Sequence, residues 1–583
     1  MNEETSSLKK QLVDGLSSGT LLEAIRCIRL NNRADREALG QEIAALHNVG
    51  KIDAIAEFRK LNRSDQQHDF FMVRHVLEKA LPLINAPVYA VMDCVTYLTE
   101  EAGGRIGHGV LSSSFIKFCE ADTERPKKVL LAALDKVDDT FAFITSAIIA
   151  GSHFQVEEYA GKAVELCSHE NLQVQCQAVH ALRCIQYGNR KDLTGESLLG
   201  IQKAVEKRCD ENLFSAALRA VFALYKVDES KEECVVEIMQ YILQQLSDTV
   251  LYAASELLFL EAKILPVSMI DLLLQALLET NAEHHEAIRD IDSGLCSLWQ
   301  RGMQESVISF LEEILVQEQH EFSVKQFNEL IWEIAENKER SLDILITRWL
   351  LSKQVALGRA AADLLEASPD DGIAVAADLD QLQELPEGIR VFLARKACGW
   401  FFHKQISAAS FIVSLIDTAS DDELEEINEI LFHPLLISYS GSVKDYLIKV
   451  VGEEPSEKVK LVIDTVLERL NIYHESLESP VDELVPTQVQ RETHLRYMNR
   501  LMAESYKEAR KNSIVEQIAT KFCLLYGSRS IHRFENEFVS QNARQEIPMQ
   551  KMRHSFEIPA LEYLDPHELN YKLLIFRAEG CGS

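Results

Sequence analysis

The sequence lacks the paired cysteines that mark zinc ribbons and disulfide-rich secreted domains. Its 12 cysteines are scattered singly over 583 residues, and none forms a C-x-x-C pair. Most occupy apolar helical positions, where a reduced thiol behaves as a small hydrophobic group. Residues 1–18 are polar and charged and do not resemble a secretory signal. These observations predict a reducing, cytoplasmic location.

The chain also has few glycines and prolines and no long apolar run. The 24 glycines and 13 prolines are sparse for this length, which favours long helices and few β-turns. A membrane-spanning helix needs about 18 consecutive apolar residues, and the nearest run, Thr140–Gly151, is shorter. The sequence therefore predicts no contact with a membrane.

Positive charge is scarce except near the C-terminus. The formal net charge is −31, which disfavours nucleic acid and anionic lipid over most of the surface and favours solubility and basic partners. Residues 488–553 differ, because their 12 basic and seven acidic residues give a net charge of +5. The remainder carries −36, so the two parts are expected to have different roles.

The segment Leu172–Lys226 contains two amphipathic helices that resemble each other at an offset of 39 residues. Small residues let neighbouring helices approach closely, and branched ones fill the space between them. A helical hairpin that recurs about every 40 residues is typical of a stacked repeat array. The matched residues are Ala178, Val179, Ala181, Leu182 and Ile185 in the first helix and Ala217, Leu218, Ala220, Val221 and Leu224 in the second.

This pattern resembles HEAT and armadillo repeats, and similar helical segments with short polar turns fill residues 125–475. The resemblance implies an all-α fold, an α-solenoid of stacked helical hairpins, with protein partners along its surface. Residues 1–124 would form an N-terminal helical or capping region and residues 476–487 a linker. Residues 488–583 would form a basic helical region with a terminal strand and helix. A non-repeating helical bundle is the alternative.

The C-terminal region offers the candidate partner-binding residues. Within Arg491–Lys511, four cations share a sector of about 60°: Arg496, Arg500, Lys507 and Lys511. Apolar residues, among them Leu495 and Met502, occupy the other side and are expected to pack. The basic face could bind an acidic protein or a nucleic acid backbone. It could equally be a solvated face with a Glu492–Arg496 pair, or fold back on the acidic repeats.

Two further elements are predicted after the basic helix. Met552–Ile558 alternates with Phe556 and Ile558 on one side, which indicates a strand and a site for β-augmentation by a partner. Asp565 and Pro566 then form a helix start, with Glu568 placed for a capping box. An apolar face follows, which must pack on the body or on another chain: Leu569, Leu573 and Phe576.

The sequence contains no catalytic motif with its full set of residues. Leu524–Arg529 resembles the glycine–serine turn of nucleotidyltransferases, but the paired aspartates that hold metal in that family are missing. A buried helix running into a turn is favoured there. The four tryptophans lie at apolar helical positions and are predicted to be core: Trp299, Trp332, Trp349 and Trp400. We predict no catalytic, cofactor-binding or metal-binding residue.

The leading hypothesis is a non-enzymatic scaffold or adaptor subunit of a cytoplasmic complex. Repeat architecture without a convergent catalytic set motivates it. One alternative is a nucleic-acid-associated factor that uses the basic helix 491–511. Another is an enzyme whose catalytic residues lie far apart in the sequence and leave no local motif.

Overall fold

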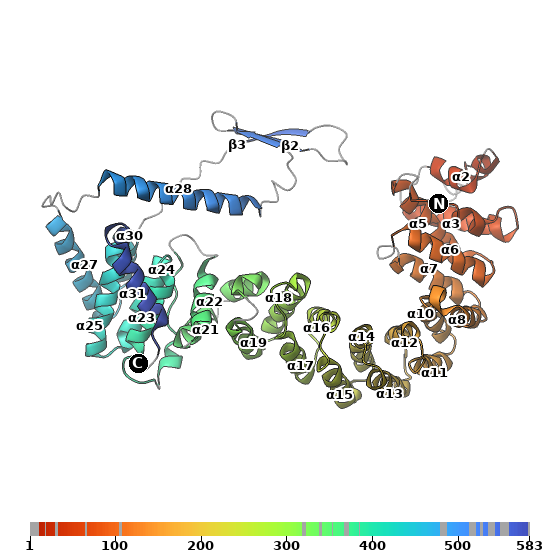
Figure 1. The fold of residues 1–583 in the computed structure, drawn as a ribbon, viewed down its shortest axis with the longest axis horizontal. Helices are drawn as coiled ribbons and strands as arrows, with labels where there is room; N and C mark the ends of the chain where they lie inside the picture. The colour runs from red at the N-terminus through yellow and green to blue at the C-terminus, as the bar shows by residue number, and fades with distance from the viewer. Residues whose placement is uncertain are drawn as a thin grey trace. The chain divides into compact units, whose positions relative to one another are not determined.

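A computed structural model shows a predominantly helical chain (Figure 1). Its contacts divide the chain into two compact units, Met1–Phe310 and Leu311–Ser583. No helix within the described ranges combines the length and apolar character needed to cross a bilayer. The predicted divisions at 124/125, 475/476 and 487/488 stay predictions. The structure describes residues 11–17, 19–28, 33–63, 67–103, 108–317, 322–336, 341–352, 354–366, 372–383, 385–477, 487–511, 521–524, 529–534, 543–548 and 559–580.

The first unit begins with short and medium helices that pack with their near neighbours in the sequence. Contacts join α3 to α5, α5 to α7 and α4 to α6, so this part already shows alternate-helix packing. The helices are α2 (Leu21–Cys27), α3 (Arg33–Asn48), α4 (Ala54–Phe58), α5 (Gln67–Ala80), η1 (Leu81–Leu83), α6 (Val88–Glu101), α7 (His108–Glu120), α8 (Arg125–Asp135) and α9 (Val137–Thr140).

The rest of the first unit forms two rows of helices, visible along opposite edges in Figure 1. Each helix contacts the next member of its own row, and most also contact a sequence neighbour in the other row. Contacts limited to neighbours are the property expected of helical repeats. The even row is α10 (Phe143–Ser152), α12 (Leu172–Cys184), α14 (Glu211–Val227), α16 (Asp248–Glu261) and α18 (His285–Gln300); the odd row is α11 (Val156–Leu166), α13 (Asp192–Lys207), α15 (Glu232–Leu243) and α17 (Val267–Leu277).

The two helices matched in the sequence are formed as α12 and α14. All ten matched residues are buried, with exposed fractions between 0% and 5%. Asp210 caps α14, because its carboxylate accepts hydrogen bonds from the N–H groups of Asn212 and Leu213. The hydroxyl of Ser247 caps α16 in the same way.

Polar contacts also join helices that lie 33 to 39 residues apart in the sequence. Arg208 donates to the side-chain oxygen of Gln175 at 3.1 Å, across 33 residues. Arg301 donates to the carbonyl oxygen of Ala262 at 3.0 Å, across 39 residues. The second contact satisfies a backbone carbonyl at the end of α16.

The second unit is also built from packed helices. Helix α23 contacts α24, α25 and the last helix, α31. Its helices are α20 (Asn328–Glu336), α21 (Ser341–Leu351), α22 (Val355–Glu366), α23 (Ile389–Phe401), α24 (Gln405–Leu415), α25 (Asp421–Ile430), the π-helical turn η7 (Leu431–Leu436), α26 (Ser442–Gly452), α27 (Glu457–Leu477), α28 (Gln488–Lys511), α30 (Ala560–Leu564) and α31 (Pro566–Ala578); α19 (Gln304–Val316) contains the boundary between the units.

The tryptophan prediction is partly wrong. Trp299 and Trp349 are buried, but Trp332 in α20 is 66% exposed. Trp400 is half-buried, and the guanidinium of Arg577 lies over its ring. Helical spacing identifies an apolar face, but it does not show whether a neighbouring helix covers that face.

Three short strands form a small antiparallel sheet in the order β1–β2–β3. They are β1 (Lys521–Leu524), β2 (Arg529–Phe534) and β3 (Ala543–Pro548), with Phe522 opposite His532. The helix expected before Tyr526 is therefore wrong, because β1 occupies that place. The strand predicted at Met552–Ile558 lies outside the described residues.

Substitution of two glycines in the neighbouring helices α10 and α11 by alanine should have opposite effects on the free energy of unfolding. A Cβ atom at Gly151 would overlap the ring of Tyr159, which is buried, whereas one at Gly161 would meet open space. We expect Gly151→Ala to lower the free energy of unfolding by about 1–3 kcal/mol. Gly161→Ala should raise it by about 0.4–1 kcal/mol, because alanine restricts the unfolded chain. Urea denaturation measures both, and equal effects would contradict this packing.

Candidate functional site

The predicted basic face lies on α28 and is exposed where it is described. Arg496 is 81% exposed and lies 3.6 Å from the carboxylate of Glu492, as the expected i,i+4 pair. Arg500 pairs with Glu504 at 2.9 Å, and Lys507 is exposed. Part of the positive charge is therefore neutralised within the helix. The side chain of Lys511, and Phe556 and Ile558 entirely, lie outside the described residues.

The apolar side of α28 does not pack as expected. Leu495 is 60% exposed, and Leu501 and Met502 are also exposed. An edge-on ring contact joins His494 to Tyr563 of α30, with ring centroids 5.2 Å apart. The spacing predicted the helix but not its surroundings, because an amphipathic pattern does not identify what covers the apolar side.

The last helix, α31, packs on the body of the second unit, as its sequence predicts. The carboxylate of Asp565 accepts a hydrogen bond from the N–H of Glu568 at 3.0 Å, and Pro566 occupies the first turn. The predicted face of Leu569, Leu573 and Phe576 is buried. Helix α31 contacts α22 and α23 through this docking.

Charged groups also hold α31 in place. The Lys572 ammonium donates to the carbonyl oxygen of His433 at 3.1 Å and lies 2.8 Å from its Nδ1. Lys396 of α23 donates to the carbonyl oxygen of Arg577 at 2.6 Å. Burial lowers the pKa of Lys396, of Lys572 and of Arg577. The docking therefore desolvates three cations, a cost that its hydrogen bonds and apolar contacts offset.

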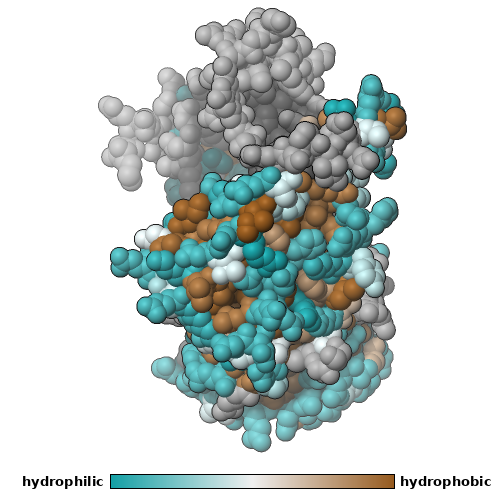
Figure 2. All heavy atoms as spheres, turned by 90° about the vertical axis from the view of Figure 1, so that its left-hand side faces the viewer, coloured by the Kyte–Doolittle hydropathy of each residue, from teal (hydrophilic) through white to brown (hydrophobic). Residues whose placement is uncertain are grey.

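Figure 2 views the molecule from the side of α25 and α27 and shows mostly hydrophilic residues with smaller apolar patches. Leu461 and Ile472 in α27 are examples of exposed apolar side chains. Single exposed apolar residues are normal on protein surfaces. This face alone does not single out a binding site.

A shallow hollow lies on the even row, between α12, α14 and α16. It is open to solvent and encloses a volume of about 30 Å³. Three successive helices of the even row contribute to it. Its lining residues are Arg183, Arg219, Phe222, Ala223, Lys226, Glu256, Leu257, Leu260 and Glu261.

Ion pairs cross one side of this hollow, from α14 to α16. Arg219 donates from Nε to the Glu256 carboxylate at 2.9 Å, and Lys226 donates to Glu261 at 2.6 Å. Within the described residues, no ion pair joins Arg183 to an acid. Arg183 thus offers an uncompensated positive charge at the α12 side of the hollow.

The charged neighbours of the hollow differ in sign from one side to the other. Desolvation, followed by repulsion from Arg183 and Arg219, lowers the pKa of His180 on α12. On α18, partial burial raises the pKa of Asp290; Arg289 opposes this shift, and Glu256 adds to it. Beyond the effect of burial, His180 is thus repelled by cations and Asp290 by a carboxylate of α16.

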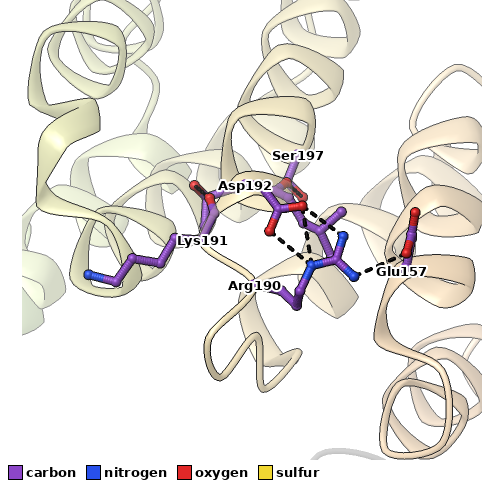
Figure 3. Close-up of polar contacts among 7 residues, drawn as sticks. Glu157, Arg190, Lys191, Asp192 and Ser197 are labelled. Carbon is purple, nitrogen blue, oxygen red and sulfur yellow. Dashed lines mark hydrogen bonds and ion pairs between the residues drawn. The ribbon is translucent and has the colours of Figure 1, made fainter.

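A second cluster, shown in Figure 3, fastens the turn between α12 and α13. The guanidinium of Arg190 donates three bonds to Asp192, at 2.9, 3.2 and 2.7 Å, and one to Glu157 of α11 at 3.0 Å. The hydrogen bonds to these carboxylates raise the pKa of Arg190, and Arg190 lowers that of Asp192. Both acids are occupied, so the cluster positions a turn rather than reacting groups.

Buried thiols are held in their protonated form. Burial raises the pKa of Cys94, Cys119, Cys167 and Cys398 to about 12. None of the ten cysteines whose side chains are described forms a disulfide. Among the described residues, no group of three or more His, Cys, Asp or Glu side chains is placed to hold a metal ion.

The hollow was not predicted from the sequence, although charged residues at a regular spacing indicate it. Arg183, Arg219 and Glu256 follow one another at 36 and 37 residues, close to the repeat period. Residues at one repeat position lie side by side in a stack. Reading the charges at equivalent positions of successive repeats would have indicated a charged stripe on the even row.

Comparisons with known proteins assign no family. No family model matches the chain, and no curated protein matches it. A crystal structure of an engineered protein is similar at 15% sequence identity, over 81% of this chain and 99% of that chain, with a TM-score of 0.26. A likeness at this level carries no argument about fold or function.

The contact between Lys572 and His433 predicts a pH-dependent docking of α31. Burial, followed by the charge of Lys572, lowers the pKa of His433, while Glu568 and Glu429 oppose this shift. Docking is then stabilised fully above the pKa of a free histidine, about 6.5, and less as the pH falls towards the lowered value. Hydrogen exchange in α31, corrected for intrinsic rates, should show less protection at about pH 5.5 than at about pH 7.5.

His433→Gln provides the control for this effect. The glutamine can accept a hydrogen bond from Lys572 but does not titrate. Its α31 should keep the same protection at both pH values. An equal loss of protection in the wild type and in this variant would show that another group is responsible.

Proposed function

We propose that this chain is a HEAT-like α-solenoid that acts as a non-enzymatic protein-interaction scaffold or adaptor. The hollow on the even row carries the proposal, because consecutive repeats together present apolar and charged side chains on one continuous surface. Repeat proteins use such extended surfaces to bind other proteins. A reducing, cytoplasmic setting, suggested by the sequence, belongs to the same proposal.

The residues around the hollow have the composition of a protein-binding surface. Leu260 of α16 is 56% exposed. Arginine side chains, here Arg183, are frequent among the residues that contribute most to binding. An apolar centre flanked by charges matches the general anatomy of protein interfaces.

A matched pair of substitutions tests the proposal. Leu260→Glu places a charge in the hollow, whereas Leu199→Glu places one on α13 of the odd row, where the leucine is 49% exposed. Both should fold like the wild type. In affinity capture from native extract with quantitative mass spectrometry, Leu260→Glu should reduce partner recovery about tenfold, and Leu199→Glu should not. Identical recovery for all three chains would contradict the proposal.

A further inference from the structure

We propose that the hollow between α12, α14 and α16 binds a peptide segment of a partner protein in which an acidic and a basic residue flank an apolar side chain. This inference rests on the proposed function and adds the chemistry of the partner. The acidic residue would lie towards α12 and the basic residue towards α16. The apolar side chain would lie between them.

The centre of the hollow suits an apolar side chain. Phe222 and Leu257 are buried in the wall, and Leu260 is more than half exposed. Ala223 also lines the hollow and is half-buried. Its small side chain leaves room for an apolar group of the partner. Covering Leu260 with an apolar group of the partner removes apolar area from water at about 25 cal/mol per Å².

The α12 side suits a carboxylate. Arg183 has no acidic partner among the described side chains, in contrast to Arg219, which pairs with Glu256. Burial is the main cause of the lowered pKa of His180, and repulsion from Arg183 and Arg219 adds to it. A guanidinium binds a carboxylate through two parallel hydrogen bonds, so Arg183 can both attract and orient an acidic side chain.

The α16 side suits a cation. Glu256, Glu261 and Asp290 lie on neighbouring helices, and the pKa of Asp290 is raised in part by Glu256. The cations Arg219 and Lys226 offset Glu256 and Glu261 from the α14 side only. A lysine or arginine of the partner would reduce the repulsion among these carboxylates from the open side.

Other occupants fit less well. A uniformly acidic segment, such as a nucleic acid backbone, would meet the carboxylates of α16 and α18. A uniformly basic segment would meet Arg183 and Arg219. The change of sign across a single hollow therefore favours a segment that changes sign in the same way.

Selection from a display library of random peptides on the immobilised full-length chain tests this inference. Enriched peptides should contain an acidic and a basic residue on either side of an apolar one. Their binding should weaken about tenfold with Arg183→Glu and with Leu260→Glu, and should be unchanged with Leu199→Glu. Circular dichroism and thermal denaturation establish that each variant is folded.

Three outcomes would overturn the inference. Enriched peptides could lack the charge pattern, could bind equally to Leu260→Glu, or could fail to appear at all. Binding that is lost in both Arg183→Glu and Leu199→Glu would also count against it, since that loss would not be specific to the hollow. If partner capture depends on Leu260 while the peptides lack the pattern, the scaffold function survives and only the partner chemistry is wrong.

Discussion

Close packing between consecutive helices of the even row is the interaction on which the other features of the first unit depend. Ala178 and Ala181 of α12 and Ala217 and Ala220 of α14 are completely buried. Small side chains at these positions allow the two helices to approach, and their large neighbours fill the remaining space. The hollow exists because this packing places Arg183, Phe222 and Leu260 from successive repeats beside one another.

Much of the helical fold could be predicted, because the signals for it are local. The buried positions of α12 and α14, the cap at Asp210 and the apolar face of α31 all follow from spacing within one helix. Leu573, which is buried, illustrates this, because its helix start and its apolar neighbours lie within a few residues. Such features do not require knowledge of distant contacts.

The candidate site could not be predicted in the same way, because it depends on neighbours far apart in the sequence. The hollow combines residues of three repeats, and Arg219 meets Glu256 only after the hairpins stack. Trp332 and Leu495 show the converse error: both lie on apolar helical faces, yet both are exposed. Amphipathic spacing identifies a face that prefers burial, whereas tertiary contacts decide whether it is covered.

Hydrogen exchange of Leu182→Ala tests the stacked arrangement most directly. Leu182 is fully buried in α12, so its truncation should cost about 2–5 kcal/mol. Among the described helices, α12 makes its main contacts with α10, α11, α13 and α14, so the loss of protection should be confined to these helices and their neighbours. Protection in α23 and α24 should remain unchanged. A uniform loss of protection across both units would contradict an array held together by neighbour contacts.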